Sequence, residues 1–120
     1  MKVLVVDDEA DSRELICYAL VEWGAEVLGA ESVRDAIDKF ATFKPDIVIS
    51  DIGMPGEDGY VLIRKLRELD KDIPAIALTA YARSEDRTRA ISSGYQQHVT
   101  KPVEPIELAT AIARLVKRSA

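Results

Sequence analysis

The sequence contains one cysteine, few aromatic residues and no long hydrophobic run, and each shortage excludes a class of protein. With Cys17 as its only cysteine, the chain cannot form an internal disulfide bond, the usual staple of small extracellular domains. The early apolar run Val3–Val6 is far shorter than the ~20 residues of a membrane-spanning helix, and it is also too short for the apolar region of a signal peptide. We therefore expect a cytoplasmic protein that does not enter a membrane.

Charge and composition narrow the chemistry further. The net charge is −5, which disfavours binding to nucleic acid, because affinity for a phosphate backbone comes from lysine and arginine side chains. Hydrophobic residues make up 48% of the chain and aromatic residues only 6%, so the core must be aliphatic, and Cys17 is expected to lie within it. A length of 120 residues is typical of one domain, so we predict a single domain over residues 1–120.

Five short apolar segments alternate with five segments of helical periodicity. The first, third and fourth apolar runs are almost uninterrupted, which is typical of parallel strands buried on both faces. The predicted strands are Val3–Val6, Glu26–Ala30, Ile47–Ser50, Ile73–Leu78 and Gln97–Val99. The apolar faces of the predicted helices are formed by Leu15, Ile16, Ala19 and Leu20, by Val33, Ala36, Ile37 and Phe40, by Val61, Leu62, Leu66 and Leu69 with Lys65 at the edge, by Ala90 and Ile91, and by Leu108, Ile112, Leu115 and Val116.

Capping and helix-breaking residues support these boundaries. Ser32, with Asp35 three residues later, is close to a capping box, and Trp23-Gly24 is a plausible end of the first helix. Because strands and helices alternate five times and helices must cover both faces of the sheet, we predict a doubly wound α/β fold with a five-stranded parallel sheet and five helices. Such folds bind ligands beyond the carboxyl ends of their strands.

Polar side chains lie at those carboxyl ends. The residues are Asp7, Asp8 and Glu9 after the first strand, Asp51 after the third, Thr79 after the fourth and Lys101 after the fifth. Because the ends converge at one edge of the sheet, one site should hold several carboxylates, a hydroxyl and an ammonium. Crowded carboxylates repel one another unless a cation neutralises them, and oxygen ligands of this kind suit Mg²⁺ or Mn²⁺.

These residue types suit phosphoryl transfer. Asp51 would be a carboxylate nucleophile, Lys101 would supply positive charge to the transferring group, and Thr79 could donate a hydrogen bond to a phosphoryl oxygen. Each residue also has an ordinary structural explanation. The early acids can cap a helix, Asp51 with Gly53 can form a turn, Thr79 can cap its strand, and Lys101 can be a surface lysine. Their joint occurrence at four strand ends favours a catalytic site.

Along essentially its whole length, the chain resembles the receiver domain family of two-component signalling. The resemblance is carried by Asp7-Asp8, by Asp51-Ile52-Gly53-Met54-Pro55-Gly56 with Gly59, by Leu78-Thr79-Ala80, and by Lys101-Pro102. It implies a flavodoxin-like strand order 2-1-3-4-5, phosphorylation of Asp51, and a cis bond between Lys101 and Pro102. It also implies Mg²⁺ ligation by Asp8 and Asp51, by Asp7 directly or through water, and by the Gly53 carbonyl. A receiver catalyses its own phosphorylation and dephosphorylation and is not a conventional enzyme.

The resemblance further implies a phosphoryl donor and a switch. The donor would be a sensor histidine kinase or a histidine phosphotransfer protein, and it would dock on the first helix around Ser12, Leu15 and Ile16. On phosphorylation, Thr79 would move toward the phosphoryl group, and the side chain three residues before the lysine would turn inward. That residue is commonly tyrosine or phenylalanine in the family and is His98 here. It is either a plain half-exposed ring on an edge strand or a pH-sensitive reporter of the phosphoryl state.

An output or homodimer face would follow the fourth helix, the fifth strand and the fifth helix, through Arg87, Ala90, Ile91, His98 and Val103. The stretches 77–87 and 101–105 are similar to those of receivers at the carboxyl end of hybrid sensor kinases. Two residues would have opposite effects on the lifetime of the acyl phosphate. Gly53 has no side chain to shield it, whereas Tyr81 would partly cover it.

Three other interpretations are compatible with parts of the sequence. A phosphohydrolase of the haloacid-dehalogenase class uses the same residue types, but its nucleophile opens an Asp-x-Asp motif, whereas this chain has Asp7-Asp8-Glu9. A flavodoxin-like cofactor carrier would need a phosphate-binding loop where the acidic stretch 7–11 would repel phosphate. A degenerate receiver that serves only for docking would not need the acid pair, Asp51, Thr79 and Lys101 together.

Overall fold

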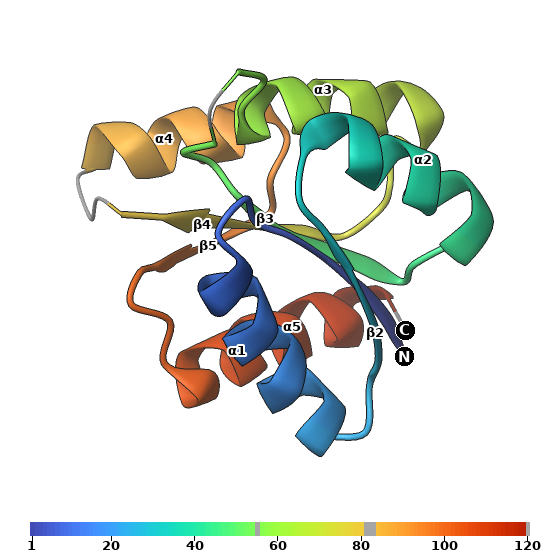
Figure 1. The fold of residues 1–120 in the computed structure, drawn as a ribbon. Helices are drawn as coiled ribbons and strands as arrows, with labels where there is room; N and C mark the ends of the chain where they lie inside the picture. Colours follow the sequence, from blue (N-terminus) through green and yellow to red (C-terminus); the bar gives the residue numbers. More distant parts are fainter. Residues whose placement is uncertain (55, 81–83, 120) are drawn as a thin grey trace.

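The protein folds as a parallel β-sheet between two layers of helices (Figure 1). This computed structural model describes residues 1–54, 56–80 and 84–119, with the side chains of all of these except residues 84, 86 and 116–119. The strands are β1 (Lys2–Val6), β2 (Glu26–Ala30), β3 (Ile47–Asp51), β4 (Ala75–Thr79) and β5 (Gln97–Thr100). The helices are α1 (Ala10–Glu22), α2 (Val33–Phe43), α3 (Gly59–Leu69), α4 (Ser84–Ser93) and α5 (Pro105–Ser119).

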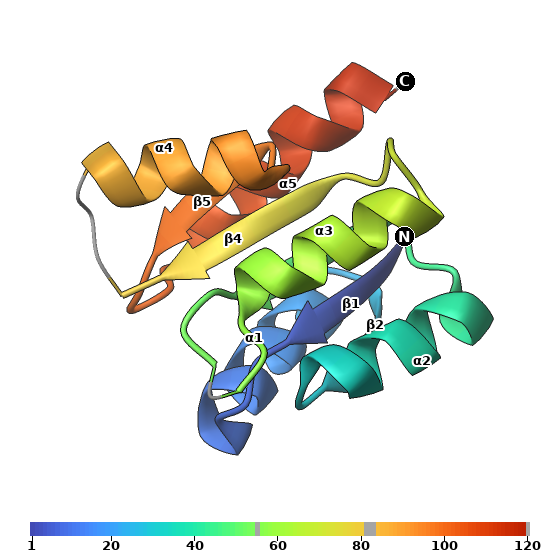
Figure 2. The same ribbon diagram turned by 90° about the horizontal axis from the view of Figure 1, so that it is seen from above.

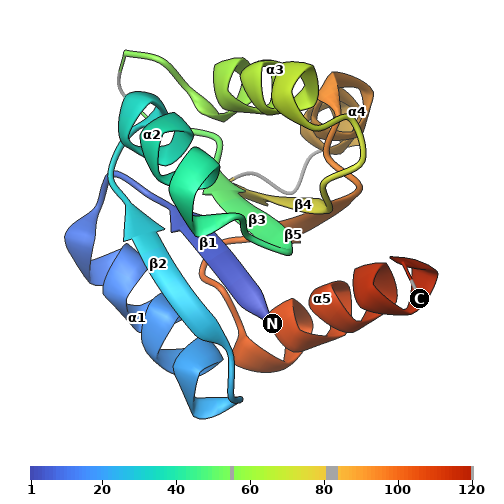
Figure 3. The same cartoon turned by 90° about the vertical axis from the view of Figure 1, so that its right-hand side faces the viewer.

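The strands lie in the order β2-β1-β3-β4-β5, and all neighbouring pairs are parallel. Helices α1 and α5 cover one face of the sheet, and α2, α3 and α4 cover the other (Figure 3). The predicted doubly wound fold and strand order are therefore confirmed. Seen from above, the arrows of β1 and β4 point the same way (Figure 2), and because all neighbouring pairs are parallel, the carboxyl ends of the strands lie at one edge of the sheet.

The strands are apolar on both faces because helices cover both faces. Along β1, Val3 and Val5 belong to the core cluster beneath α1 and α5, while Leu4 and Val6 belong to the cluster beneath α2 and α3, and all four are completely buried. Cys17 packs, half-buried, against the first cluster, and burial raises the pKa of its thiol. This environment agrees with the expected role of Cys17 as a core residue.

The helix ends follow most of the capping predictions. Ser32 is the N-cap of α2, and its Oγ accepts a hydrogen bond from the backbone N–H of Asp35 at 3.1 Å. The Asp35 carboxylate accepts from the N–H of Glu31 at 3.1 Å, so the reciprocal bond of the predicted capping box is displaced by one residue. Helix α1 has Trp23 as its C-cap, and Gly24 follows with a φ of +89°, the left-handed conformation that glycine adopts readily.

Strand β4 begins two residues later than predicted. The expected strand started at Ile73, whereas the observed one starts at Ala75. Pro74 has no N–H to donate, although its carbonyl accepts a hydrogen bond from the N–H of Val48 at 2.9 Å. Regular strand pairing therefore starts after the proline, while Ile73, which is 5% exposed, still contributes its side chain to the core.

Three helical residues that were expected on apolar faces are exposed. The exposed fractions are 68% for Leu15, 59% for Leu69 and 47% for Ile91. These helices carry apolar residues over more of their circumference than the sheet can contact, so the predicted faces were too wide. The side chain of Val116 lies outside the described residues. Within the described part of the chain, no helix combines the length and the apolar character needed to span a membrane.

Replacing Ser32 with alanine is expected to lower the free energy of unfolding by about 1 kcal/mol, because the amide of Asp35 loses its acceptor at the start of α2. Urea denaturation followed by circular dichroism measures this difference. The Ser32→Asp variant keeps an acceptor and places negative charge at the helix N-terminus, so it should stay within about 0.5 kcal/mol of the wild type. Equal stabilities for the alanine variant and the wild type would show that the cap contributes nothing.

Candidate phosphoacceptor and metal site

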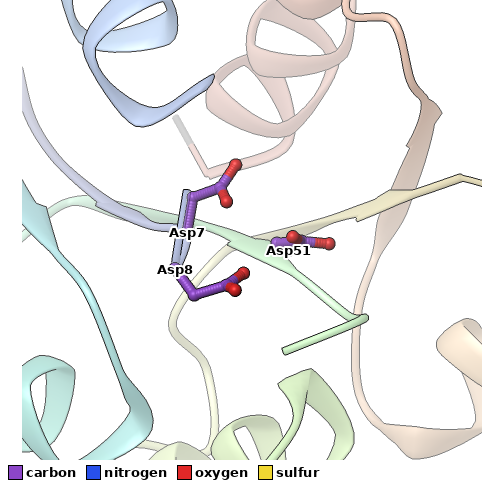
Figure 4. A group of neighbouring side chains, drawn as sticks. All are labelled: Asp7, Asp8 and Asp51. Carbon is purple, nitrogen blue, oxygen red and sulfur yellow. The ribbon is translucent and has the colours of Figure 1, made fainter. Parts of the chain in front are cut away.

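The carboxyl ends of four strands bring the predicted site residues to one edge of the sheet. Asp51 is the last residue of β3 and Thr79 the last of β4, while Asp7 and Asp8 directly follow β1 and Lys101 directly follows β5. Figure 4 shows the three aspartates gathered together, two from the segment after β1 and one from the end of β3. The parallel arrangement of the strands thus assembles residues that are far apart in the sequence.

The ammonium of Lys101 joins two of the carboxylates. Its Nζ lies 3.1 Å from Oδ2 of Asp7 and 3.1 Å from Oδ2 of Asp51. Asp7 is completely buried and Asp51 is 6% exposed, whereas the Lys101 side chain is 20% exposed. Buried carboxylates need such a partner, because the loss of hydration would otherwise strongly disfavour their charged forms.

Backbone amides orient the remaining carboxylate oxygens. Oδ1 of Asp7 accepts a hydrogen bond from the N–H of Glu9 at 3.0 Å, and Oδ1 of Asp51 accepts one from the N–H of Gly53 at 3.1 Å. Each of the two buried carboxylates therefore has one oxygen on the ammonium and one on a backbone amide. This arrangement sets their orientation before any ligand binds. The peptide bond between Lys101 and Pro102 is cis.

The pKa directions of Asp51 and Lys101 reflect burial and the mutual contacts of the charged groups. Burial raises the pKa of Asp51, and the hydrogen bond and charge of Lys101 offset only part of this effect, while the nearby Asp7 adds to it. Burial on its own would lower the pKa of Lys101, but its hydrogen bonds to Asp51 and Asp7 outweigh burial and raise that pKa. An additional cation would relieve the remaining repulsion.

Asp7, Asp8 and Asp51 form a donor set that fits a divalent cation. One carboxylate oxygen from each lies within 4.8 Å of the others, and Asp8 is the exposed member of the three. A hard cation such as Mg²⁺ or Mn²⁺ takes carboxylate oxygens and keeps several waters, and the exposed side of the cluster leaves room for those waters. Gly53, whose carbonyl was expected as a further ligand, is an exposed residue two positions after Asp51.

The two expected switch residues lie on neighbouring strands. Thr79 is 5% exposed, and its carbonyl oxygen accepts a hydrogen bond from the backbone N–H of Lys101 at 2.7 Å. His98 is a half-buried residue of the edge strand β5, paired in register with Ala77 of β4. Tyr81, which was expected to cover the acceptor partly, lies outside the described residues.

The loop after Asp51 depends on a residue that the sequence analysis did not single out. Asp58 is the N-cap of α3, and its Oδ1 accepts hydrogen bonds from the N–H groups of Tyr60 at 3.0 Å and Val61 at 3.1 Å. An aspartate directly before an apolar helical stretch is a local signal that could have identified this cap. Gly59 packs so closely on the end of β3 that an added Cβ would lie 2.6 Å from the carbonyl oxygen of Asp51. This contact depends on tertiary packing.

A groove of about 640 Å³ lies beside the site, between α1 and the segment that leads from Lys101 into α5. The expected docking residues Ser12, Leu15 and Ile16 all line it. Leu15 and Tyr18 are each 68% exposed, so they can contact a partner directly. Ile16 is only 4% exposed and belongs to the core, so its side chain supports the groove from below and does not project from the surface.

Known proteins share this sequence pattern. Residues 3–113 match the response regulator receiver domain family. The chain is 46% identical over 110 residues to an uncharacterized 14.6 kDa protein of Leptolyngbya boryana, a match that covers 90% of this chain and 84% of the relative. It is 34% identical over 119 residues to the phosphate regulon transcriptional regulatory protein PhoB of Escherichia coli, a match that covers 98% of this chain and 52% of PhoB. The chain thus spans about half the length of that relative.

The fold agrees with a solved structure as well. The chemotaxis protein CheY4 of Vibrio cholerae superimposes with a TM-score of 0.90 at 29% identity, covering 95% of this chain and 97% of CheY4. A family match over almost the whole chain, together with this fold, excludes the phosphohydrolase and cofactor-carrier interpretations. The chain belongs to the response regulator receiver domain family, the CheY-like receivers of two-component signalling.

Proposed function

We propose that the chain is a Mg²⁺-dependent phosphoswitch that accepts a phosphoryl group on Asp51 from a phosphohistidine. The observation that supports this function best is the Asp51 carboxylate itself. It is 6% exposed, lies 3.1 Å from the Lys101 ammonium, and adjoins two more aspartates that complete a donor set for a divalent cation. A receiver that served only for docking would have no use for a carboxylate that is oriented and charge-compensated in this way.

Asp51 is the nucleophile of the proposed reaction. One of its carboxylate oxygens attacks the phosphorus atom, and a new O–P bond forms as the N–P bond to the donor imidazole breaks. The imidazole leaves with the electron pair of the broken bond, and the product is an acyl phosphate on Asp51. Mg²⁺, when bound by Asp8, Asp51 and the Gly53 carbonyl with help from Asp7, supplies positive charge to the transferring oxygens. In the second half of the cycle, water attacks the phosphorus atom, the O–P bond to Asp51 breaks, and inorganic phosphate leaves, which restores the carboxylate.

Lys101 and Thr79 respond to the new charge. The phosphoryl group carries about −1.5 to −2 charges and three acceptor oxygens, and it replaces the single charge of the Asp51 carboxylate. The Lys101 ammonium, which lies between Asp7 and Asp51, therefore exchanges one of its two carboxylate partners for a more highly charged one. The Thr79 hydroxyl donates a hydrogen bond to a phosphoryl oxygen, and its displacement reaches β5, where His98 lies. A nearly complete switch between two states needs about 5.5 kcal/mol of differential binding, which several new charge-assisted hydrogen bonds can supply together.

Two surfaces suit partners in this scheme. The groove beside α1 opens next to Lys101, so a histidine kinase or histidine phosphotransfer protein seated in it would stand beside the acceptor. The output or homodimer face would follow α4, β5 and α5. On that face Ile91 is 47% exposed and available to a partner, whereas Ala90 is completely buried beneath α4 and serves the core.

Acetyl phosphate tests the acceptor directly. Incubation of the protein with acetyl phosphate and Mg²⁺ should increase its intact mass by about 80 Da, the mass of one phosphoryl group. The gain should disappear with EDTA and in Asp51→Asn, because the first lacks the cation and the second lacks the nucleophile. Asp38→Asn, which changes an exposed aspartate on α2, serves as the matched control and should be phosphorylated normally. No gain in the wild type under any condition would instead support a docking-only receiver.

Magnesium alone should stabilise the fold, since the acid cluster that binds it exists only in the folded chain. At a concentration about 100 times its Kd, Mg²⁺ should add about 2.7 kcal/mol to the free energy of unfolding, which thermal denaturation detects as a higher Tm. Asp8→Ala should lose this Mg²⁺ effect while leaving the metal-free fold at least as stable as the wild type, because Asp8 is exposed and its charge repels the other two aspartates. Glu31→Ala controls for a lost surface charge, and an equal Mg²⁺ response in Asp8→Ala would contradict the proposed site.

The groove beside α1 can be separated from the chemistry. Leu15→Ala should lower kcat/KM about tenfold for phosphotransfer from a histidine kinase or phosphotransfer protein that phosphorylates the wild type, as expected for a central apolar contact. Phosphorylation by acetyl phosphate should not change, because this donor needs no docking surface. Leu69→Ala removes an equally large, exposed side chain from α3 and is the control. If both variants accept the phosphoryl group at the wild-type rate, α1 is not the docking surface.

A further inference from the structure

Tyr95 is a buried tyrosine with a long-range hydrogen bond to the acceptor region. It lies between α4 and β5, is 1% exposed, and is one of the largest fully buried side chains of the described residues. Its hydroxyl donates a hydrogen bond to the carbonyl oxygen of Gly59 at 2.6 Å, across 36 positions in the sequence. Burial raises the pKa of Tyr95 far above its ordinary value, so the hydroxyl keeps its proton and remains a donor.

Gly59, which accepts the hydrogen bond from Tyr95, also contacts the backbone of the acceptor and of the residue after it. Its N–H donates to the carbonyl oxygen of Ile52 at 3.0 Å, and an added Cβ would lie 2.6 Å from the carbonyl oxygen of Asp51. Ser50 also contacts the backbone of the acceptor. Its Oγ donates to the same Asp51 carbonyl oxygen at 3.0 Å, and its side chain also interacts with the Tyr95 hydroxyl. The backbone of the acceptor therefore lies in a buried polar cluster that Tyr95 completes.

The backbone around Tyr95 is held equally firmly. Its own N–H donates to the carbonyl oxygen of Ala90 at 3.1 Å, which ties it to α4. The carbonyl oxygen of Gly94 accepts hydrogen bonds from Nη2 of Arg67 at 2.6 Å and from Nε at 3.2 Å. The N–H of Gln96 donates to Ala75 of β4 at 3.0 Å. Tyr95 thus belongs to the fixed connection between α4 and β5, two of the elements of the proposed output face.

We propose that Tyr95 is a positioning residue for the phosphorylation of Asp51. Its hydroxyl holds Gly59, the first residue of α3, close to the backbone of Asp51, and in doing so it connects the acceptor to the segment between α4 and β5. The role rests on the proposed function of Asp51 as the acceptor. It belongs to the hydroxyl and not to the ring, because a phenyl ring would fill the same core volume without reaching the Gly59 carbonyl.

The loop between β3 and α3 ends at Gly59, which Tyr95 anchors, and it includes Gly53, whose N–H orients the Asp51 carboxylate at 3.1 Å. Without the hydroxyl, this loop loses an anchor while every charged group of the site remains in place. The expected consequence is weaker Mg²⁺ binding together with slower phosphorylation. A tyrosine that served only to stabilise the core would change the Tm and leave both of these quantities unchanged.

The Tyr95→Phe variant of the full chain tests this role. Its Kd for Mg²⁺, from calorimetric titration of metal-free protein, should rise about fivefold, and its rate of phosphorylation by acetyl phosphate should fall by about the same factor, as expected for one hydrogen bond of ordinary strength. Ile47→Val is the matched control. It removes a methylene from a core residue at the amino end of β3, in the cluster beneath α1 and α5, so it should lower the Tm and change neither the Kd nor the rate.

Wild-type values of both the Kd and the rate in Tyr95→Phe would overturn the proposal, whatever the change in Tm. If Tyr95→Phe does not fold, Ser50→Ala removes the other hydroxyl of the cluster and should slow phosphorylation, and an unchanged rate in that variant would overturn the proposal instead. The proposed function fails separately, when the wild type itself takes no phosphoryl group from acetyl phosphate. In that case the Mg²⁺ titration still decides whether the Tyr95 hydroxyl holds the loop.

Discussion

The ammonium of Lys101, held between the carboxylates of Asp7 and Asp51, is the interaction on which the rest of this structure depends. Two carboxylates cannot remain charged in the core without a cation, and this cation comes from a residue 94 positions from one partner and 50 from the other. The three groups meet only when β1, β3 and β5 occupy their places in one parallel sheet. The aliphatic core supplies the stability of that sheet, and the sheet in turn supplies the geometry of the site.

Much of this arrangement could be predicted from the sequence because strands buried on both faces leave a clear pattern. The run Val3–Val6 is wholly apolar and Ile47–Ser50 has one polar residue, the last, and a charged residue that directly follows such a run must lie at the carboxyl end of a strand. In a parallel sheet these ends meet at one edge, so Asp51 and Lys101 could be placed together from their positions alone. The Ser32 cap was also predictable, because the capping serine and the residue that it caps, Asp35, are only three positions apart.

Apart from the Asp58 cap, which has a local signal, the features that were missed depend on contacts between distant segments. The hydrogen bond from Tyr95 to Gly59 joins residues 36 positions apart, and nothing near Tyr95 in the sequence indicates where its hydroxyl points. The exposure of Leu15 could not be predicted either, because helical periodicity shows which side chains share a face but not how much of that face the sheet covers. The direction of the Asp51 pKa also depends on the balance between burial and a lysine from another strand.

The difference in exposure within the acid cluster has a consequence for the order of events at this site. Of the three aspartates, Asp7 and Asp51 are buried and Asp8 is exposed, so a cation is expected to enter the cluster from the side of Asp8. Under the proposed docking, a protein donor in the groove beside α1 and Lys101 would have to bring its phosphohistidine to Asp51, and it would then cover this edge of the sheet. Binding would then be ordered, with the metal ion first and the donor second, and raising the metal concentration would never displace the donor.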